Sequence, residues 1–141
     1  MSEKNKRIDR RFYEVVWNEG NYGFVDEVTA DDYVYHELPD DIFVGPESMK
    51  RNIATMRKAF PDLHFTIEDQ IAEGDRVVTR WTAQGTHKAL FEGIPPTGKQ
   101  AVVMGISINR IANGRFVEGW TSFDRLSLLQ LLDAVPAPAS S

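Results

Sequence analysis

The chain has no cysteine among its 141 residues. This absence excludes disulfide bridges, thiolate metal ligands and cysteine nucleophiles. Histidine is nearly as scarce, because only His36, His64 and His87 are present. A metal site built from histidines is therefore not expected, and we predict a protein that works without a bound metal or cofactor.

An excess of positive charge is also missing, since the formal net charge is −5 at pH 7. A protein that binds nucleic acid needs a basic surface to displace the counterions of the phosphates. A nucleic-acid partner is therefore not expected.

Long hydrophobic runs are absent as well. None approaches the roughly 20 residues that a membrane-spanning helix needs. The first residues, MSEKNKRIDRRF, lack the apolar segment of a signal peptide. We therefore expect a cytoplasmic protein that has no membrane partner.

What the chain does contain is the composition of a globular domain. Hydrophobic residues make up 42% of it and charged residues 26%, which argues against wholesale disorder. We predict a single domain over residues 1–133. Proline, alanine and serine dominate residues 134–141, which we expect to form a flexible tail.

The first half of the sequence favours helices. Ile8, Phe12, Val15 and Val16 recur at helical spacing, and Gly20-Asn21 follows as a stop signal. A short second helix is expected over residues 24–28. Gly45-Pro46-Glu47 predicts the start of a third helix, because proline in the first turn loses no hydrogen bond, and Pro61 should end it.

The second half of the sequence favours strands. A short strand is expected at residues 33–36, and the pattern alternates with a period of two after Pro61. Longer strands are predicted over residues 76–87, 102–111 and 116–123, followed by a short apolar helix over residues 126–132. Helices followed by a run of antiparallel strands indicate an α+β fold, with the helices on one face of a curved sheet.

Several short strings, in this order and spacing, resemble the SnoaL-like polyketide cyclase family. The resemblance covers residues from about 8 to 133. The strings are AFPDL (59–63), EGDRVV (73–78), GTH (85–87), GIPPTGK (93–99) and NGR (113–115), followed by Glu118, Trp120 and Asp124.

The resemblance implies the cone-shaped fold shared by ketosteroid isomerase and nuclear transport factor. In that fold a mixed, mostly antiparallel sheet curves into a cone, N-terminal helices cover it, and a short helix ends the chain. The implied activity is a cofactor-independent intramolecular aldol cyclisation, in which a pocket acid or base handles the proton. In the founding cyclases the catalytic aspartate aligns with Thr121, and a Gln and a His that help to bind the substrate align with Gly105 and Ser107. All three residues differ here.

Which side chains reach the implied cavity depends on the hairpin turn at Ala112-Asn113-Gly114. A two-residue loop pairs Ala112 with Arg115 and Ser107 with Trp120, whereas a three-residue loop pairs Gly105 with Thr121. We favour the three-residue loop, because it groups the family's pocket positions on one face. Gly105, Ser107, Gly119 and Thr121 would then face the cavity, while Met104, Ile106, Ile108 and Trp120 would lie on the convex face.

Two residues are the candidate catalytic groups. His36 follows the short strand and precedes the loop at residues 37–41, a region that borders the pocket mouth in this fold, so it could act as a base or donate to a ligand carbonyl. Asp124 could hold a proton or orient a base, although its position before the last helix also predicts an N-cap. A carboxylate in a largely apolar cavity has its pKa raised toward the working range.

The remaining candidates would line the ligand pocket. Tyr13 and Trp17 lie four residues apart on the first helix and could reach the cavity entrance, although packing between helix and sheet explains them as well. His87 could close one end of the cone. Trp120 offers a flat surface and one N–H donor, either to a ligand or to plain packing. Phe60 would form part of the apolar wall.

Three functions remain open at this point. The first is a cofactor-independent cyclase, isomerase or lyase that acts on a small apolar carbonyl compound. The second is a non-catalytic or vestigial dimeric binding protein, and the third is an epoxide hydrolase-like or hydroxylase-like use of the same cavity. Chemistry is favoured if His36 or Asp124 is buried and faces the cavity, and binding is favoured if both are exposed or capped.

We also predict a partner for the convex face. An apolar stripe of Met104, Ile106 and Ile108 with Trp120 would need cover. The expectation is a homodimer in which two sheets meet back to back.

Overall fold

The computed structural model of the chain describes residues 2–37 and 41–134. The predicted tail therefore lies almost entirely outside the described residues. The elements run in the order α1 (Ser2–Phe12), η1 (Tyr13–Trp17), α2 (Gly23–Val28), β1 (Thr29–Glu37), β2 (Asp41–Val44), α3 (Gly45–Ala59), β3 (His64–Glu73), β4 (Arg76–Thr86), β5 (Gln100–Ala112), β6 (Arg115–Phe123) and α4 (Arg125–Leu131).

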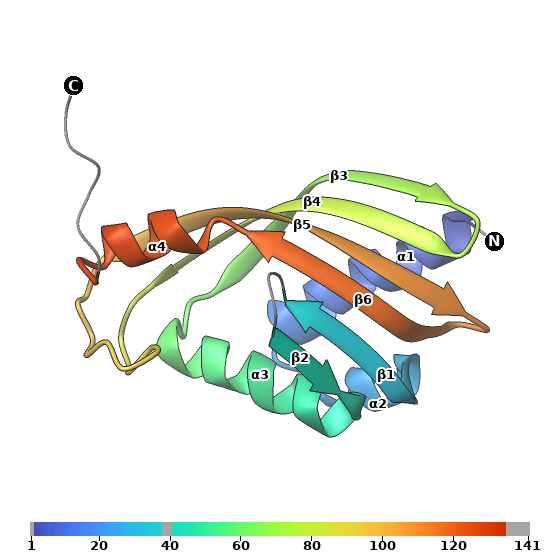
Figure 1. Cartoon of the computed structure of the whole chain (residues 1–141), viewed down its shortest axis with the longest axis horizontal. Helices are drawn as coiled ribbons and strands as arrows, with labels where there is room; N and C mark the ends of the chain where they lie inside the picture. Colours follow the sequence, from blue (N-terminus) through green and yellow to red (C-terminus); the bar gives the residue numbers. More distant parts are fainter. Residues whose placement is uncertain (1, 38–40, 135–141) are drawn as a thin grey trace.

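The predicted α+β architecture is confirmed. Six strands form one sheet in the order β2-β1-β6-β5-β4-β3, and every neighbouring pair is antiparallel except β1 and β6. Figure 1 shows α1, α2 and α3 on one side of the sheet, with α4 extending from the end of β6. In the described part of the chain, no helix is long and apolar enough to cross a membrane.

Helix boundaries follow the sequence signals closely, with one irregularity. Pro46 lies in the first turn of α3, and the helix gives way to Phe60 just before Pro61. The first helix widens at its end into η1, a turn of π-helix that holds Tyr13 and Trp17. Such turns are rare and are frequent at functional sites.

The strand pattern differs from the prediction in β2, which we did not expect. Its four residues pair with β1 at the edge of the sheet. Four residues are too few for an alternating pattern to stand out.

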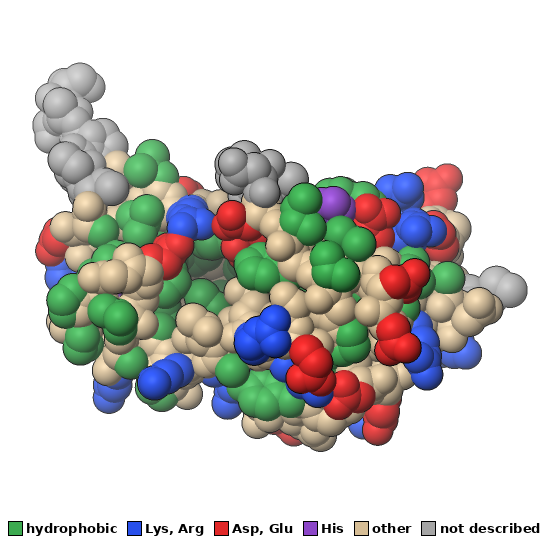
Figure 2. Space-filling view, turned by 60° about the horizontal axis from the view of Figure 1, so that its bottom comes forward, with side chains coloured by type: hydrophobic (Ala, Val, Ile, Leu, Met, Phe, Trp, Pro, Cys, Tyr) green, Lys and Arg blue, Asp and Glu red, His purple; other side chains and the backbone are tan. Residues whose placement is uncertain are grey.

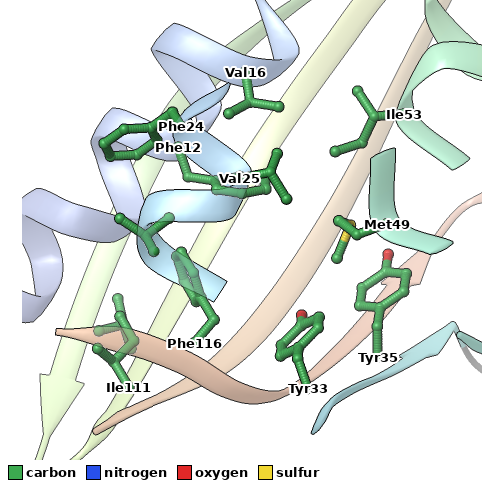
Figure 3. Close-up of a cluster of buried hydrophobic side chains, with 12 residues drawn as sticks. Phe12, Val16, Phe24, Val25, Tyr33, Tyr35, Met49, Ile53, Ile111 and Phe116 are labelled. Carbon is green, nitrogen blue, oxygen red and sulfur yellow. The ribbon is translucent and has the colours of Figure 1, made fainter. Parts of the chain in front are cut away.

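The core lies between the helices and one face of the sheet, which we call the inner face. Figure 3 shows one of its two clusters, in which Phe12, Val16 and Phe24 of the helical segments pack toward Ile111 and Phe116 of the sheet. The second cluster centres on Phe60, Phe65 and Trp81. Along β5, buried and exposed residues alternate from Ala101 to Ser107, so the opposite, outer face carries Val102, Met104 and Ile106.

The β5–β6 hairpin has a different loop length from the one predicted, although Ser107 and Thr121 still share the inner face as expected. The loop has two residues, not three: Ala112 pairs with Arg115, and Asn113 and Gly114 both have positive φ, at 53° and 77°. The register then shifts between Arg110 and Ile111. This β-bulge adds one residue to β6, so the same side chains face inward as a three-residue loop would have placed there. Ser107 therefore pairs with Thr121, and both are buried on the inner face.

Candidate functional site

A cavity lies between the helices and the inner face of the sheet. Its volume is about 110 Å³. This is several times the roughly 10–15 Å³ that one water molecule needs. Its wall is mostly apolar and draws on η1, α3, α4 and every strand except β2. Figure 2 shows the surface hollowed on this side of the molecule, with hydrophobic side chains around the hollow. The polar lining residues are Tyr13, Thr29, Tyr33, Tyr35, Glu37, Asn52, Gln84, Ser107, Asn109 and Thr121.

Four of these residues and Trp81 form a hydroxyl cluster around Ser107 of β5 and Thr121 of β6. The Trp81 indole N–H donates to Ser107 Oγ at 3.0 Å, and Ser107 Oγ lies 2.8 Å from Thr121 Oγ1. The Tyr13 hydroxyl lies beside Ser107 and the Tyr35 hydroxyl lies beside Thr121, close enough for these neighbours to offset part of the rise in the pKa of each phenol. These five residues, Tyr13, Tyr35, Trp81, Ser107 and Thr121, are called the hydroxyl cluster below.

The hydroxyl cluster has one donor to spare. Each of its five groups carries one N–H or O–H proton, and two hydrogen bonds join Trp81, Ser107 and Thr121, which carry three of these protons. One O–H proton is therefore left for a ligand oxygen. Burial raises the pKa of Tyr13 and of Tyr35 well above the ordinary value, so both phenols stay protonated and can donate.

Glu37 lies beside this cluster. It is half-buried at the end of β1, where it pairs with Thr121 of β6. Among the described residues that line the cavity, it is the one with an ionisable carboxylate, and no lysine, arginine or histidine joins it there. Burial raises the pKa of Glu37; the nearby Arg125 partly offsets this, and Asp41 adds to it.

Arg125, the first residue of α4, holds its charge near Glu37. Its guanidinium lies 3.9 Å from Asp41 Oδ2 on β2 and forms an ion pair with Glu92. These charges are exposed, so they contribute little to stability. Their position gives the region around Glu37 a charged rim over an apolar interior.

A second polar group lies behind the wall, around the fully buried Asp9. Its carboxylate accepts hydrogen bonds from Thr79 Oγ1 at 2.5 Å, Asn109 Nδ2 at 2.8 Å and Gln70 Nε2 at 3.2 Å. Burial raises the pKa of Asp9, and these donors counteract only part of the rise.

The raised pKa of Asp9 predicts a stability effect with a definite sign. On raising the pH, the unfolded chain loses this proton first, near the ordinary value of about 3.9. Asp9 therefore favours folding most at low pH, and this contribution is lost as the pH rises through the folded-state pKa. We expect the difference in unfolding free energy between wild type and Asp9→Asn to shrink from low to neutral pH, as measured by urea titrations.

Asp32→Asn provides the control for this prediction, because Asp32 is an exposed carboxylate on β1. Its difference from wild type should stay nearly constant over the same pH range. A constant difference for Asp9→Asn as well would contradict the prediction.

Five of the sequence-predicted site residues line the cavity: Tyr13, Trp17, Phe60, Ser107 and Thr121. Tyr13 and Trp17 both pack on Phe65 of the sheet, with ring centroids 5.6 and 4.8 Å from it. The widened turn η1 therefore presents both aromatic side chains to the same apolar wall.

The structure does not bring His36 or Trp120 into the cavity lining. Side chains alternate along β1, so Tyr35 and Glu37 face inward while His36 faces outward. On the outer face its Nε2 lies 2.9 Å from Glu118 Oε2, and its ring stacks on Trp120 at 5.4 Å. The expectation that His36 borders the pocket failed because the strand continues through Glu37 instead of ending before it.

Asp124 is also absent from the cavity lining. It caps α4, accepting from the Ser127 backbone N–H at 3.1 Å and from the Ser127 hydroxyl at 2.7 Å. These bonds hold the pKa of the exposed Asp124 carboxyl below its usual range, which suits a cap and not a proton carrier. Of the two interpretations left open for Asp124, the structure supports the cap.

His87 and Gly105 are buried, but neither lines the cavity. His87 packs between Phe60 and Phe91, and its Nδ1 accepts from the Thr97 backbone N–H at 3.2 Å. It therefore anchors the loop before β5. Gly105 lies under the Trp81 ring and has no side chain to offer.

Sequence reasoning missed Glu37, Tyr33 and Tyr35, although one signal was present. The alternation of Tyr33 and Tyr35 extends by one more step to Glu37, which places all three side chains on one face. Asn109 falls on the inner face by the same rule, two residues after Ser107. Among the described residues, no group of three His, Asp or Glu side chains is placed to hold a metal ion.

Comparison with known proteins agrees with this architecture. The model of the SnoaL-like polyketide cyclase family matches residues 8–132. No curated protein sequence matches the chain.

Solved structures extend the comparison. A protein from Acidithiobacillus ferrooxidans, assigned as a polyketide cyclase, is 33% identical, with 93% of this chain and 95% of that chain covered and a TM-score of 0.83. IdmH from Streptomyces antibioticus, with the same assignment, is 30% identical over 92% of this chain and 98% of its own, with a TM-score of 0.80. AclR from Streptomyces galilaeus, assigned as a hydroxylase, is 26% identical over 99% of this chain and 87% of its own, with a TM-score of 0.87.

Proposed function

Because the chain belongs to the SnoaL-like polyketide cyclase family, we propose that it is a cofactor-independent enzyme that enolises a small apolar carbonyl compound. The observation that carries the proposal is the position of Glu37. Its half-buried carboxylate ends β1 beside the hydroxyl cluster, in a cavity whose other lining residues carry no formal charge.

The chemistry divides between these two groups. Glu37 removes a proton from the carbon next to the carbonyl, and the bonding electrons move onto the carbonyl oxygen. The spare O–H of the hydroxyl cluster donates to that oxygen, where negative charge develops. The enolate carbon then attacks a second carbonyl in a cyclisation or regains a proton in an isomerisation.

Burial gives Glu37 the pKa shift that this role needs. A carboxylate with the ordinary pKa of a glutamate, about 4.3, is a weak base toward a carbon acid. Removing water from around the charged form raises its pKa and strengthens the base. The neutral hydroxyl cluster stabilises the enolate without stabilising the ground state to the same degree.

Proton exchange tests the proposal without knowledge of the natural substrate. 4-Methylacetophenone, an apolar methyl ketone, is incubated with the protein in D2O, and loss of its methyl ketone proton signal is followed by NMR. We expect exchange well above the buffer rate. Exchange at the buffer rate, with the probe shown to bind, would leave the second function, a non-catalytic binding protein, as the better description.

AclR supports the hydroxylase-like alternative, since it is assigned as a hydroxylase and spans nearly the whole chain. That use of the cavity would require binding of a reduced substrate and oxygen chemistry, neither of which depends on Glu37 as a base. Hydroxylation of a reduced substrate by dioxygen that survives loss of the Glu37 carboxylate would favour it.

We also propose that a second copy of the chain covers the outer face of β5. Val102, Met104 and Ile106 are 56%, 64% and 48% exposed there, on a strand in the interior of the sheet. Neighbouring apolar side chains of this size, left in water, favour association.

Light scattering at micromolar concentration tests the homodimer. Wild type should have twice the chain mass, and Ile106→Lys should be a monomer, because one charge in each copy would meet its symmetry mate in the interface. Thr66→Lys, at an exposed position on β3, is the matched control and should remain dimeric. A monomeric wild type would refute this proposal.

A further inference from the structure

The cavity has a second polar region, separate from the hydroxyl cluster. Thr29 and Tyr33 of β1 and Asn109 of β5 all line it. We call these three residues the inner polar group. The enolisation chemistry uses none of them, and the Thr29 hydroxyl has no partner within the protein.

The amide of Asn109 is held in one orientation. Its Nδ2 donates to Asp9 Oδ1 at 2.8 Å, which directs its Oδ1 away from Asp9, and the Tyr33 hydroxyl lies 3.5 Å from that oxygen. Turning the amide over would place its oxygen against a carboxylate oxygen. Asp9 therefore fixes Asn109 as an acceptor toward the cavity.

Thr29 adds an unused hydroxyl. The residue is 2% exposed, and its Oγ1 has no hydrogen-bond partner in the structure. Buried polar groups are nearly always hydrogen-bonded, so an exception in the wall of a cavity calls for an explanation. A ligand atom would supply the missing partner.

Gly119 shows that the polar atoms of Asn109 and Tyr33 converge. A methyl group on its Cα would overlap both Asn109 Oδ1 and Tyr33 Oη. The two oxygens therefore lie over the same point of β6, and the missing side chain of Gly119 leaves room for both of them there.

We propose that the inner polar group is a binding subsite for a hydroxyl group of the ligand. The ligand hydroxyl donates to Asn109 Oδ1 and accepts from the hydroxyl of Thr29 or Tyr33. A ligand carbonyl could not satisfy the Asn109 acceptor, and a ligand anion would find no lysine, arginine or histidine among the described lining residues. A ligand cation would find no free carboxylate, because both oxygens of Asp9 already accept hydrogen bonds.

The spacing of the two polar regions narrows the ligand class. Ser107 and Asn109 are two residues apart on the same face of β5, which corresponds to roughly 7 Å. If the carbonyl lies at the hydroxyl cluster, which rests on the proposed function, the hydroxyl lies about one aromatic ring away. The substrate class is then a hydroxylated aryl or cyclic ketone.

Two probes of nearly equal shape test the subsite. 4-Hydroxyacetophenone and 4-methylacetophenone differ only by a hydroxyl in place of a methyl, and NMR titration gives the dissociation constant of each. We expect wild type to bind the hydroxyl probe about 3- to 10-fold more tightly, the range of one or two neutral hydrogen bonds. Thr29→Val keeps the side-chain shape and leaves no internal partner unpaired, and it should remove most of this preference.

Thr66→Val is the control, because it makes the same change on the exposed surface of β3. It should keep the wild-type preference. Tyr33→Phe gives a second variant, in which the preference should also fall while the affinity for 4-methylacetophenone stays unchanged.

The subsite is refuted if wild type binds both probes equally or if Thr29→Val retains the full preference. This failure is distinguishable from failure of the proposed enolisation. 4-Methylacetophenone lacks the hydroxyl, so its proton exchange in D2O reports on Glu37 whether or not the subsite exists.

Discussion

Replacement of Glu37 with glutamine should slow the exchange of methyl ketone protons by about 10²- to 10⁴-fold, the usual contribution of a general base. Glutamine keeps the shape of the side chain but cannot accept a proton. The affinity for 4-methylacetophenone should change little, because the substitution removes the proton acceptor of the reaction but not the contacts that bind the ketone. NMR exchange rates and titrations on the same samples separate the two effects.

The pH dependence gives this prediction a second readout. Only the ionised carboxylate is a base, so the wild-type rate should rise with pH and level off above the pKa of Glu37. Burial raises that pKa, so the midpoint should lie above the ordinary glutamate value of about 4.3. The residual rate of Glu37→Gln should not show this midpoint.

His36→Gln is the discriminating control, because His36 is the base that the sequence suggests. In the structure it faces outward and bonds to Glu118, so its loss should change the exchange rate by less than about 2-fold. If His36→Gln abolished exchange and Glu37→Gln did not, the assignment of the base to Glu37 would be wrong.

Replacement of Gly105 with alanine should destabilise the fold by about 3 kcal/mol, the sum of overpacking and a weakened hydrogen bond. A Cβ at this position would overlap the six-membered ring of Trp81 and lie 2.9 Å from Phe123 Cβ. Trp81 cannot retreat, because Phe65 packs on its ring at 4.8 Å and Ser107 holds its indole N–H.

Thermal unfolding followed by circular dichroism measures this loss. For a domain of this size, about 3 kcal/mol corresponds to a fall in Tm of roughly 10 °C. Gly23→Ala is the matched control, because its new methyl group would meet Asn21 at an ordinary 3.4 Å. An unchanged Tm for Gly105→Ala would mean that the Trp81 ring moves freely.

Much of the fold could be read from the sequence, because helix caps and strand alternation act locally. Pro46 and Pro61 mark α3 at both ends, and the period of two marks β4 to β6. The bulge that sets the β5–β6 register could not be predicted in this way. In the bulge, Val117 of β6 has no pairing partner on β5, because Arg110 pairs with Glu118 and Ile111 with Phe116. Nothing in the sequence near Arg110 indicates this.

The site was harder to predict, because it depends on which side of a strand each side chain faces and not on the residue type alone. His36 is the more familiar catalytic residue, but its neighbour Glu37 points inward. One residue along a strand reverses the side on which a group acts. Asp9 was missed for a different reason, because its charged flanking residues gave it the pattern of a solvated helix face, and only the fold buries it under β3, β4 and β5.

The hydrogen bond between Asp9 and Asn109 joins residues that are 100 positions apart in the chain. Closing a loop of that length carries an entropic cost that must be met before the bond can form. During synthesis this hydrogen bond cannot form until Asn109 of β5 has been added to the chain. The cavity wall likewise draws on residues from Phe12 to Leu128, so it is complete only when both ends of the domain have come together.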